Sequence, residues 1–199
     1  MQDVPEIAQL IERYRFKNDG SGSLLPLSEE DIVNIIIDSR LGTFFSVVDT
    51  QRERLVGCVS VVEYGMPDDL EEFSSKQLLD GLYRILPEYL IRPHFRALKE
   101  GQTFDNGNIV ELRSLAVSEE YRGLNLGSRL IRRSKVEAKA RKFSELYSLV
   151  NHDVYPLFER EGFVSLQGRM PQKLYRDCQI CPLRFACPEI PVVAYLATV

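Results

Sequence analysis

Two glycines and an arginine lie between a strand-like and a helix-like segment in the stretch EYRGLNLGSRLI, residues 120–131. A glycine-rich turn that opens a helix leaves several backbone N–H groups pointing outward, and the helix dipole adds positive potential at the same end. Small residues also let an anion approach the backbone closely. The residue types at this junction therefore predict a binding site for a phosphate or diphosphate.

Two well-known phosphate loops do not fit this stretch. The P-loop ends in Gly-Lys-Ser/Thr, and the dinucleotide fingerprint needs three spaced glycines with an acidic residue about 20 positions further on. The stretch has no Gly-Lys-Ser/Thr ending, and it offers only Gly123 and Gly127. Another kind of phosphate loop is therefore required.

A charged pair precedes this loop, in the apolar segment NIVELRSLAV. Glu111 and Arg113 are two residues apart, so on a strand their side chains point to one face, which by strict alternation also carries Leu115 and Val117. Charges on a largely apolar face need partners. Either the two residues form a structural ion pair, or Glu111 acts as a base and Arg113 binds a carboxylate.

The hydrophobic pattern around these residues predicts an α/β domain. Helices are expected around residues 5–14, after Ser28 as N-cap, over residues 126–142, and over residues 155–163 with Gly162 at the C-terminal end. Strands are expected at residues 43–49, 54–64, 108–117, 145–150 and 190–196. The second helix should bury Ile32, Ile35 and Ile36.

Residues 65–107 differ in character, because they are charged, helix-prone and interrupted by Pro87 and Pro93. We expect one or two helices here, which either cover a site or decorate the surface. The whole chain, residues 1–199, is then a single domain with this helical insertion and a cysteine-containing tail at about residues 170–199.

Composition limits the class of protein. The chain has 199 residues, 44% of them hydrophobic and 27% charged, with a formal net charge of −4. This charge gives no basic footprint, so nucleic acid is not an expected partner. The N-terminus lacks a signal-peptide pattern and no apolar run approaches the roughly 20 residues that cross a bilayer, so we expect a cytoplasmic protein without a membrane partner.

In a cytoplasmic protein the four cysteines are expected as thiols or metal ligands rather than disulfides. Cys178, Cys181 and Cys187 form a CxxC pair with a third cysteine six residues later. Zinc sites usually need four ligands, and the candidates for the fourth are Cys58, His94 and His152. We expect no metal, with a buried or redox-responsive thiol cluster as the alternative to a metal site. His152 is either an auxiliary base or a polar loop residue.

The segment RGLNLG resembles the Arg/Gln-x-x-Gly-x-Gly loop of the GCN5-related N-acetyltransferases, the GNAT family. ELRSLAVSEEYRG resembles the family's fourth strand, and LYSLVNHDVYPLFEREGF resembles its later strand and helix; together they span residues 111–163. The family's middle glycine is Asn125 here, and asparagine tolerates positive φ better than most residues. The resemblance implies the GNAT fold, a mixed sheet that is splayed at the acetyl-CoA site and flanked by helices.

Two terminal segments resemble the short amino-acid acetyltransferases of the N-acetylglutamate synthase type. GSLLPLSEEDI is similar to their LLPRS entry segment, with Leu27 in place of arginine, and MPQKLYRDCQICPLRFACPEIPVV is similar to their tail, with Gln172 in place of histidine. The resemblance implies an acceptor that is the α-amine of an amino acid, with glutamate as the first candidate and arginine biosynthesis as the pathway. It places the insertion between the family's third and fourth strands.

The resemblance also implies roles for individual residues around acetyl-CoA. Backbone groups that hold the pantetheine arm and polarise the carbonyl would belong to Leu115, Ala116 and Val117. Amides that cradle the pyrophosphate would belong to Arg122, Gly123, Leu124, Asn125, Leu126, Gly127 and Ser128. Asn151 would contact the cofactor, Glu111 would act as general base through a water molecule, and Arg113 and Lys173 would bind an acidic acceptor.

Many family members use a tyrosine on the short helix to protonate the departing thiolate. Phe158 occupies that position here, and Tyr155 lies on another face of the helix, so water is the expected proton source. The resemblance allows a homodimer. Two alternatives stay open: a different small amine or acyl donor, and a module that binds acyl-CoA without turnover.

Overall fold

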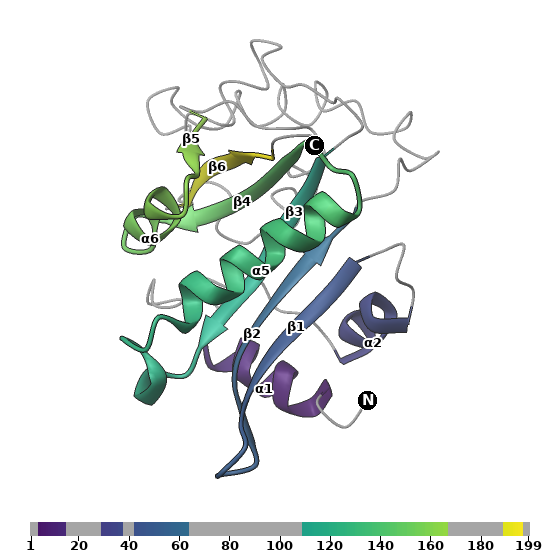
Figure 1. Cartoon of the computed structure of the whole chain (residues 1–199). Helices are drawn as coiled ribbons and strands as arrows, with labels where there is room; N and C mark the ends of the chain where they lie inside the picture. The colour runs from purple at the N-terminus through teal and green to yellow at the C-terminus, as the bar shows by residue number, and fades with distance from the viewer. Residues whose placement is uncertain (1–3, 15–28, 38–41, 64–108, 167–188, 197–199) are drawn as a thin grey trace, which may run out of the picture.

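The computed structural model describes residues 4–14, 29–37, 42–63, 109–166 and 189–196, and its centre is a six-stranded sheet (Figure 1). In spatial order the strands are β1 (Gly42–Asp49), β2 (Arg54–Val62), β3 (Ile109–Val117), β4 (Glu145–Asn151), β6 (Glu189–Tyr195) and β5 (Val164–Ser165). β3 and β4 are parallel and all other neighbours are antiparallel, so the sheet is mixed.

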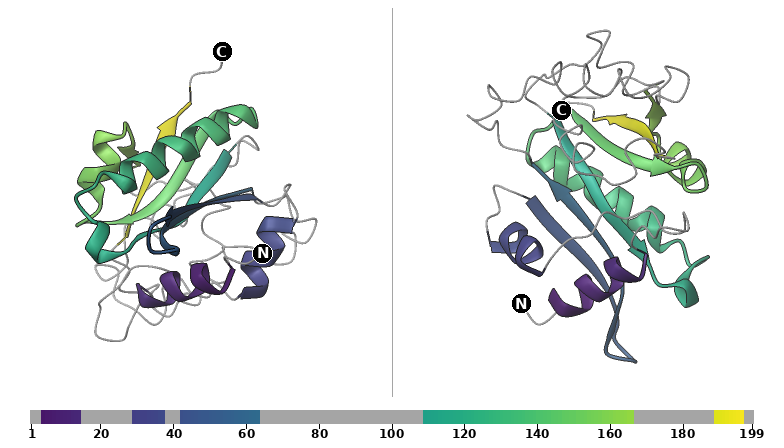
Figure 2. Two further views of the ribbon diagram at one scale, coloured as in Figure 1. Left: turned by 60° about the horizontal axis from the view of Figure 1, so that its bottom comes forward. Right: turned by 180° about the vertical axis from the view of Figure 1, so that it is seen from behind.

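Helices cover both faces of this sheet (Figure 2). The helices described are α1 (Val4–Arg13), α2 (Glu29–Ile37), α5 (Leu126–Ala140) and α6 (Tyr155–Arg160). α1 and α2 pack on one face, against β1, β2 and β3, and α5 lies across the other face, with α6 beside it. None of the described helices is long and apolar enough to cross a membrane.

Each face has its own hydrophobic core. On the α5 face, Leu130, Ile131 and Ala138 of the helix pack against alternate residues of the strands, as the period of 3.6 in the helix and of 2 in the strand requires. On the opposite face, Ile7, Leu10 and Ile11 of α1 pack with Cys58 and Ala116. The stripe on α5 and the stripe on α1 therefore hold the central strands β2 and β3 from both sides.

The expected helices and strands are confirmed in the described residues, with two differences. Ile32 and Ile35 are buried as expected, but Ile36 is 39% exposed, because it lies past the edge of the stripe that faces β1. β5 was not expected, since two residues are too short for a recognisable pattern. Gly162 takes the left-handed φ of +80° predicted for the end of the short helix.

The expected splay of the sheet is confirmed between β3 and β4. These strands pair only from Ile109 to Glu111, opposite Glu145 to Tyr147, and then separate (Figure 1). The insertion at residues 65–107 enters between β2 and β3 of this numbering and lies outside the described residues, as does the tail up to residue 188.

Candidate active site

The loop between β3 and α5 has the backbone geometry that an anion site needs. A 3-10 turn, η2 (Glu119–Tyr121), leads into Gly123 at φ +80° and Asn125 at φ +63°, and α5 begins at the next residue. Arg129 N donates to Asn125 O at 3.1 Å. Within the described part of the chain, the amides of residues 123–128 donate to no backbone carbonyl outside the helix, so they are available to an anion. The amide of Arg122, which was also expected to hold the pyrophosphate, instead donates to Glu119 O at 3.1 Å and closes the η2 turn.

The residue types in the loop occur for different structural reasons. At Gly123 a Cβ would meet nothing within 4 Å, so glycine is needed for its positive φ and not for space. At Gly127 a Cβ would lie 3.2 Å from Leu157 Cδ2, so glycine allows α5 to approach α6 closely. Asn125 adopts the left-handed conformation, which confirms that the turn survives without the family's middle glycine.

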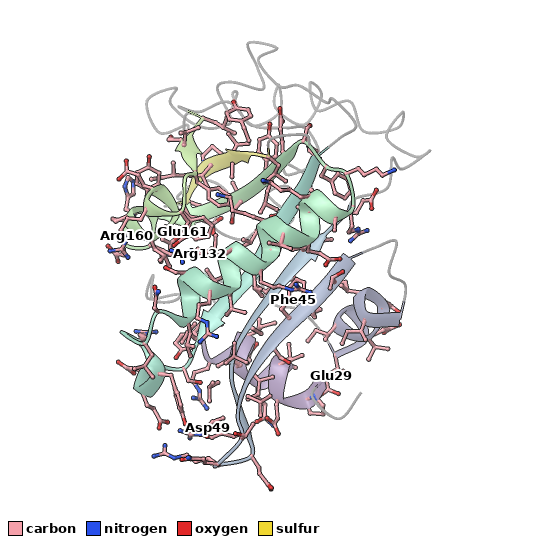
Figure 3. All side chains as sticks on the ribbon, in the orientation of Figure 1. Glu29, Phe45, Asp49, Arg132, Arg160 and Glu161 are labelled. Carbon is pink, nitrogen blue, oxygen red and sulfur yellow. The ribbon has the colours of Figure 1, made fainter. Side chains whose placement is uncertain are left out.

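An ion pair joins α5 to the end of α6 (Figure 3). Arg132 Nε and Nη2 donate to the two carboxylate oxygens of Glu161 at 2.8 and 3.0 Å, and Lys135 Nζ donates to the Glu161 carbonyl. The Arg132 guanidinium holds the pKa of the Glu161 carboxyl below its usual value, and the Ser128 hydroxyl adds to this effect. The bidentate pair therefore fixes the first turns of α5, where the loop amides lie.

The charge of Glu161 should stabilise the fold in a pH-dependent way. Because its pKa is lower in the folded than in the unfolded chain, its contribution is present above the unfolded pKa and is lost as the pH falls through the folded pKa. We expect Glu161→Gln to lower the melting temperature by about 2–4 °C at pH 7. The difference from the wild type should disappear in melts at acidic pH, and an unchanged difference there would contradict this assignment.

A β-bulge bends β3 where it separates from β4. Cys58 is in register with Ala116 but Ser60 with Arg113, so Ser114 and Leu115 together lie opposite one residue of β2. Ser114 has a φ of +54°, the left-handed conformation found at the first residue of one bulge type. The Ser60 hydroxyl donates to Arg113 O at 3.2 Å and the Cys58 thiol donates to Ser114 O at 3.5 Å. Both carbonyls are therefore directed to β2.

The bulge turns the backbone of Leu115 toward the gap. The Ser148 hydroxyl of β4 donates to Leu112 O at 2.9 Å, so the backbone of Leu112 faces β4. Since the next two residues face β2, alternation directs the N–H and C=O of Leu115 back to the β4 side, where the strands no longer pair. At the end of β4, Asn151 Oδ1 is buried and has no hydrogen-bond partner among the described residues. These groups fit an amide-containing arm such as pantetheine.

The same bulge corrects one expectation from strict alternation. Leu115 and Val117 do not share a face with Glu111 and Arg113; they pack against the core on the α5 face. Ala116 instead lies on the α1 face. The extra residue at the bulge shifts the alternation by one position, which exchanges the faces of all residues after it.

The charged pair lies where the strands begin to separate. Glu111 is 5% exposed and is in register with Tyr147, the last paired position of β3 and β4. Arg113 Nε lies 3.8 Å from Glu111 Oε2, so the ion pair of the structural interpretation is present. The backbone of Glu111 lies at the vertex of the gap, since Glu111 is the last residue of β3 that pairs with β4. The base and clamp roles stay predictions.

The other candidate residues in the described part of the chain are either packed in the core or exposed in a loop. Phe158 is 2% exposed and packs edge-on against Phe163, with ring centroids 5.0 Å apart. Tyr155 is half-buried against the same core, and His152 is exposed in the turn after β4, as expected of a polar loop residue. Cys58 is fully buried, and burial raises the pKa of its thiol to about 12.

Several predictions fall outside the described residues: Lys173, His94 and the three cysteines Cys178, Cys181 and Cys187. In the part of the chain that the structure describes, no group of three His, Cys, Asp or Glu side chains could hold a metal ion.

A comparison with protein families identifies the family that has this loop and gap. The profile of the acetyltransferase (GNAT) family matches residues 5–163, which includes α1, the bulged strand, the loop and α6. The chain belongs to the GNAT family. An uncharacterised N-acetyltransferase of Chlorobaculum tepidum is 33% identical over 114 residues, which cover 53% of this chain and 72% of that relative.

Solved GNAT structures share the fold. The N-acetylglutamate synthase of Neisseria gonorrhoeae, crystallised with coenzyme A and N-acetylglutamate, superposes with a TM-score of 0.62 at 20% identity over 99% of this chain. The chain spans 34% of that longer protein. A Mycobacterium tuberculosis protein crystallised with coenzyme A has a TM-score of 0.59 at 15% identity, covering 98% of this chain and 95% of its own. At these identities the likeness shows the fold.

This GNAT chain is therefore an acetyl-CoA-dependent acyltransferase, and its cofactor is coenzyme A. The free loop amides, the outward backbone of Leu115 and the orphaned Asn151 oxygen are the groups that fit the coenzyme. Sequence reasoning did not find the bulge at Ser114, because a serine in a β-rich segment carries no signal for positive φ. It also missed the anchor between Arg132 and Glu161, whose partners are 29 residues apart.

Proposed function

We propose that this chain transfers the acetyl group of acetyl-CoA to the α-amine of an amino acid, with glutamate as the first candidate. The observation that carries the proposal is the ion pair between buried Glu111 and half-buried Arg113 at the point where β3 and β4 separate. Glu111 is suited to accept a proton and Arg113 to bind a carboxylate. An amino acid carries both an ammonium group that must lose a proton and a carboxylate. The likeness to an N-acetylglutamate synthase crystallised with N-acetylglutamate adds support.

Different residues along the gap would bind the coenzyme and transfer the protons. Acetyl-CoA supplies the acetyl thioester, which an unprotonated amine can attack. The loop amides of residues 123–128 would hold the pyrophosphate, and the backbone of Leu115 and Val117 would hold the pantetheine arm and polarise the carbonyl. Ala116, expected in the same role, lies between them, and by the same alternation its backbone faces Cys58 of β2. Glu111 would take a proton from the incoming ammonium group through a water molecule. Phe158 has no proton to give, so the proton for the leaving thiolate would come from water.

The acceptor's carboxylate would be held by Arg113, whose planar guanidinium suits bidentate binding. Lys173 would assist from the tail, outside the described residues. If glutamate is the acceptor, the product would be N-acetylglutamate and the pathway that of arginine biosynthesis in the cytoplasm.

Replacing Arg113 by alanine tests the carboxylate clamp. Because charge-assisted hydrogen bonds to a carboxylate contribute about 1.5–3 kcal/mol, we expect KM for glutamate to rise by about 10- to 100-fold. Arg160→Ala is the matched control, since Arg160 is exposed on α6 (Figure 3). Steady-state rates of thiol release at varied glutamate measure the effect. An unchanged KM for glutamate in Arg113→Ala would remove Arg113 from the acceptor site.

A second candidate is acetylation of a different small amine, or use of another acyl donor. It is favoured by the two departures from the amino-acid acetyltransferase pattern, Leu27 and Gln172, and by the additional residues 65–107 that the family resemblance marks as an insertion. Thiol release that requires an amine without a carboxylate would support this candidate over glutamate.

A further inference from the structure

The entrance to the phosphate loop is tied to the β1–β2 hairpin by a network of five side chains, in which Arg52 Nη1 donates to Glu120 Oε2 at 3.4 Å and to the Tyr121 hydroxyl at 3.5 Å. The Tyr121 hydroxyl donates to Asp49 Oδ2, and Arg54 Nη2 donates to that hydroxyl at 3.2 Å. The same Arg54 nitrogen donates to Glu120 Oε2, and the Arg54 guanidinium lies 5.2 Å from the centroid of the Tyr121 ring. Asp49 and Arg54 belong to the hairpin, whereas Glu120 and Tyr121 form η2, which leads directly into the loop.

Asp49 connects this network to the hairpin turn itself. Its Oδ1 accepts hydrogen bonds from the backbone amides of Gln51 and Arg52 at 3.0 and 3.2 Å, while its Oδ2 accepts from Tyr121. The Tyr121 hydroxyl is the main reason that the pKa of Asp49 lies below its usual value. One carboxylate therefore holds both the turn at the hairpin end (Figure 3) and the turn before the loop, 72 residues later.

The loop needs this support on its N-terminal side. On the other side, α5 is held by the Arg132–Glu161 pair and by contact of Gly127 with Leu157. η2 is three residues long and has no buried side chain, and its turn is closed by hydrogen bonds from Tyr121 N to Ser118 O and from Arg122 N to Glu119 O. At its start, Ser118 N donates to Val56 O at 2.8 Å, a backbone hydrogen bond to the sheet. Such a turn lacks the hydrophobic contacts that keep longer elements in place. The Arg122 guanidinium lies 5.3 Å from the ring centroid of Tyr14 on α1, a second contact at the same end of the molecule.

We propose that Tyr121 is a positioning residue for coenzyme A: through Asp49 and Arg54 it holds η2 on the hairpin and so keeps the amides of residues 123–128 in the arrangement that binds the pyrophosphate. Tyr121 does not have to touch the coenzyme for this role. Loss of its hydroxyl leaves the loop free to sample other conformations, and binding must then restore the ordered one, which weakens affinity without altering the chemistry at the gap.

The experiment compares Tyr121→Phe with the wild type, because phenylalanine keeps the ring and removes only the hydroxyl. We expect the Kd for coenzyme A, measured by calorimetry, to rise by about 5- to 10-fold, which is less than the full value of a hydrogen bond to a charged group because the bond acts on the coenzyme only through the loop. Hydrogen exchange of the amides of Tyr121 and Arg122, which donate the two hydrogen bonds of the η2 turn, should become faster, while exchange in β4 should not change. With S-acetylpantetheine, which lacks the pyrophosphate, the KM for the donor should equal that of the wild type.

Thr43→Val is the matched control. The Thr43 hydroxyl donates to Glu137 Oε1 at 3.2 Å and joins β1 to α5. This variant therefore also loses a side-chain hydrogen bond made by β1, the strand that contains Asp49, but at a position far from the loop. It should leave the Kd for coenzyme A unchanged. A Kd in Tyr121→Phe equal to that of the wild type would overturn the proposal, and so would an equal rise of KM for acetyl-CoA and S-acetylpantetheine. The binding and exchange measurements require no acceptor, so they test Tyr121 independently of the proposed substrate.

Discussion

Glu111→Gln is expected to lower kcat by about 10²–10⁴-fold, the usual contribution of a positioned general base, while the Kd for coenzyme A stays unchanged. Glutamine has nearly the same shape as glutamate and keeps the packing of a side chain that is 5% exposed. It cannot accept the proton of an ammonium group at neutral pH. Thiol release under saturating acetyl-CoA and acceptor measures kcat, and calorimetry measures binding.

Glu63→Gln is the control for this prediction. Glu63 also pairs with an arginine, with Arg141 Nη2 2.7 Å from Glu63 Oε2, but it lies at the end of β2 and is partly exposed. Its replacement should leave kcat near the wild-type value. If Glu111→Gln is fully active, the pair with Arg113 is structural and the base must be sought elsewhere; a rise in activity with pH in that variant would point to an acceptor that loses its proton to solvent.

Gly123→Val is expected to weaken coenzyme A binding by at least about tenfold. A left-handed conformation costs an L-residue about 1–2 kcal/mol, and more for a β-branched side chain. Since nothing surrounds this position within 4 Å, the loop can relieve the strain by changing its backbone, and the amides of residues 123–128 then leave their positions. The measurement is the Kd for coenzyme A, with the melting temperature determined in parallel.

Two control variants distinguish the general effect of backbone strain from the specific effect of a changed loop conformation. Gly162→Val imposes the same strain at φ +80° at the end of α6, so it should lower the melting temperature and leave coenzyme binding much closer to the wild type. Asn125→Gly keeps a residue that accepts positive φ inside the loop, so it should bind coenzyme A at least as tightly as the wild type. Wild-type affinity in Gly123→Val would show that the loop amides do not hold the coenzyme.

Much of the fold was predictable because it follows from local patterns. The stripe that includes Leu130, Ile131 and Ala138 has helical spacing, and these residues form the buried face of α5. The loop was predictable for the same reason: Gly123, Asn125 and Gly127 are residue types that either accept positive φ or occupy little space, and they lie directly before a helix. Such signals need no knowledge of distant contacts.

The details that shape the site were not predictable, because they depend on contacts between distant residues. The bulge at Ser114 arises where β3 pairs with β2, more than 50 residues earlier, and nothing in the segment ELRSLAV indicates an extra residue. Tyr121 and Asp49 meet across 72 residues, and each reads as an ordinary surface residue in its own segment. Strict alternation therefore placed Leu115 and Val117 on the wrong face.

Free-thiol release from acetyl-CoA in the presence of each of the twenty amino acids and a few polyamines tests the central claim most directly. We expect release that depends on glutamate, saturates with its concentration, and is lost in Glu111→Gln. Release that requires a different amine would keep the acetyltransferase chemistry and discard glutamate and its pathway. If no amine gives thiol release although calorimetry shows tight binding of coenzyme A, the claim that this chain transfers the acetyl group to an amino acid is contradicted.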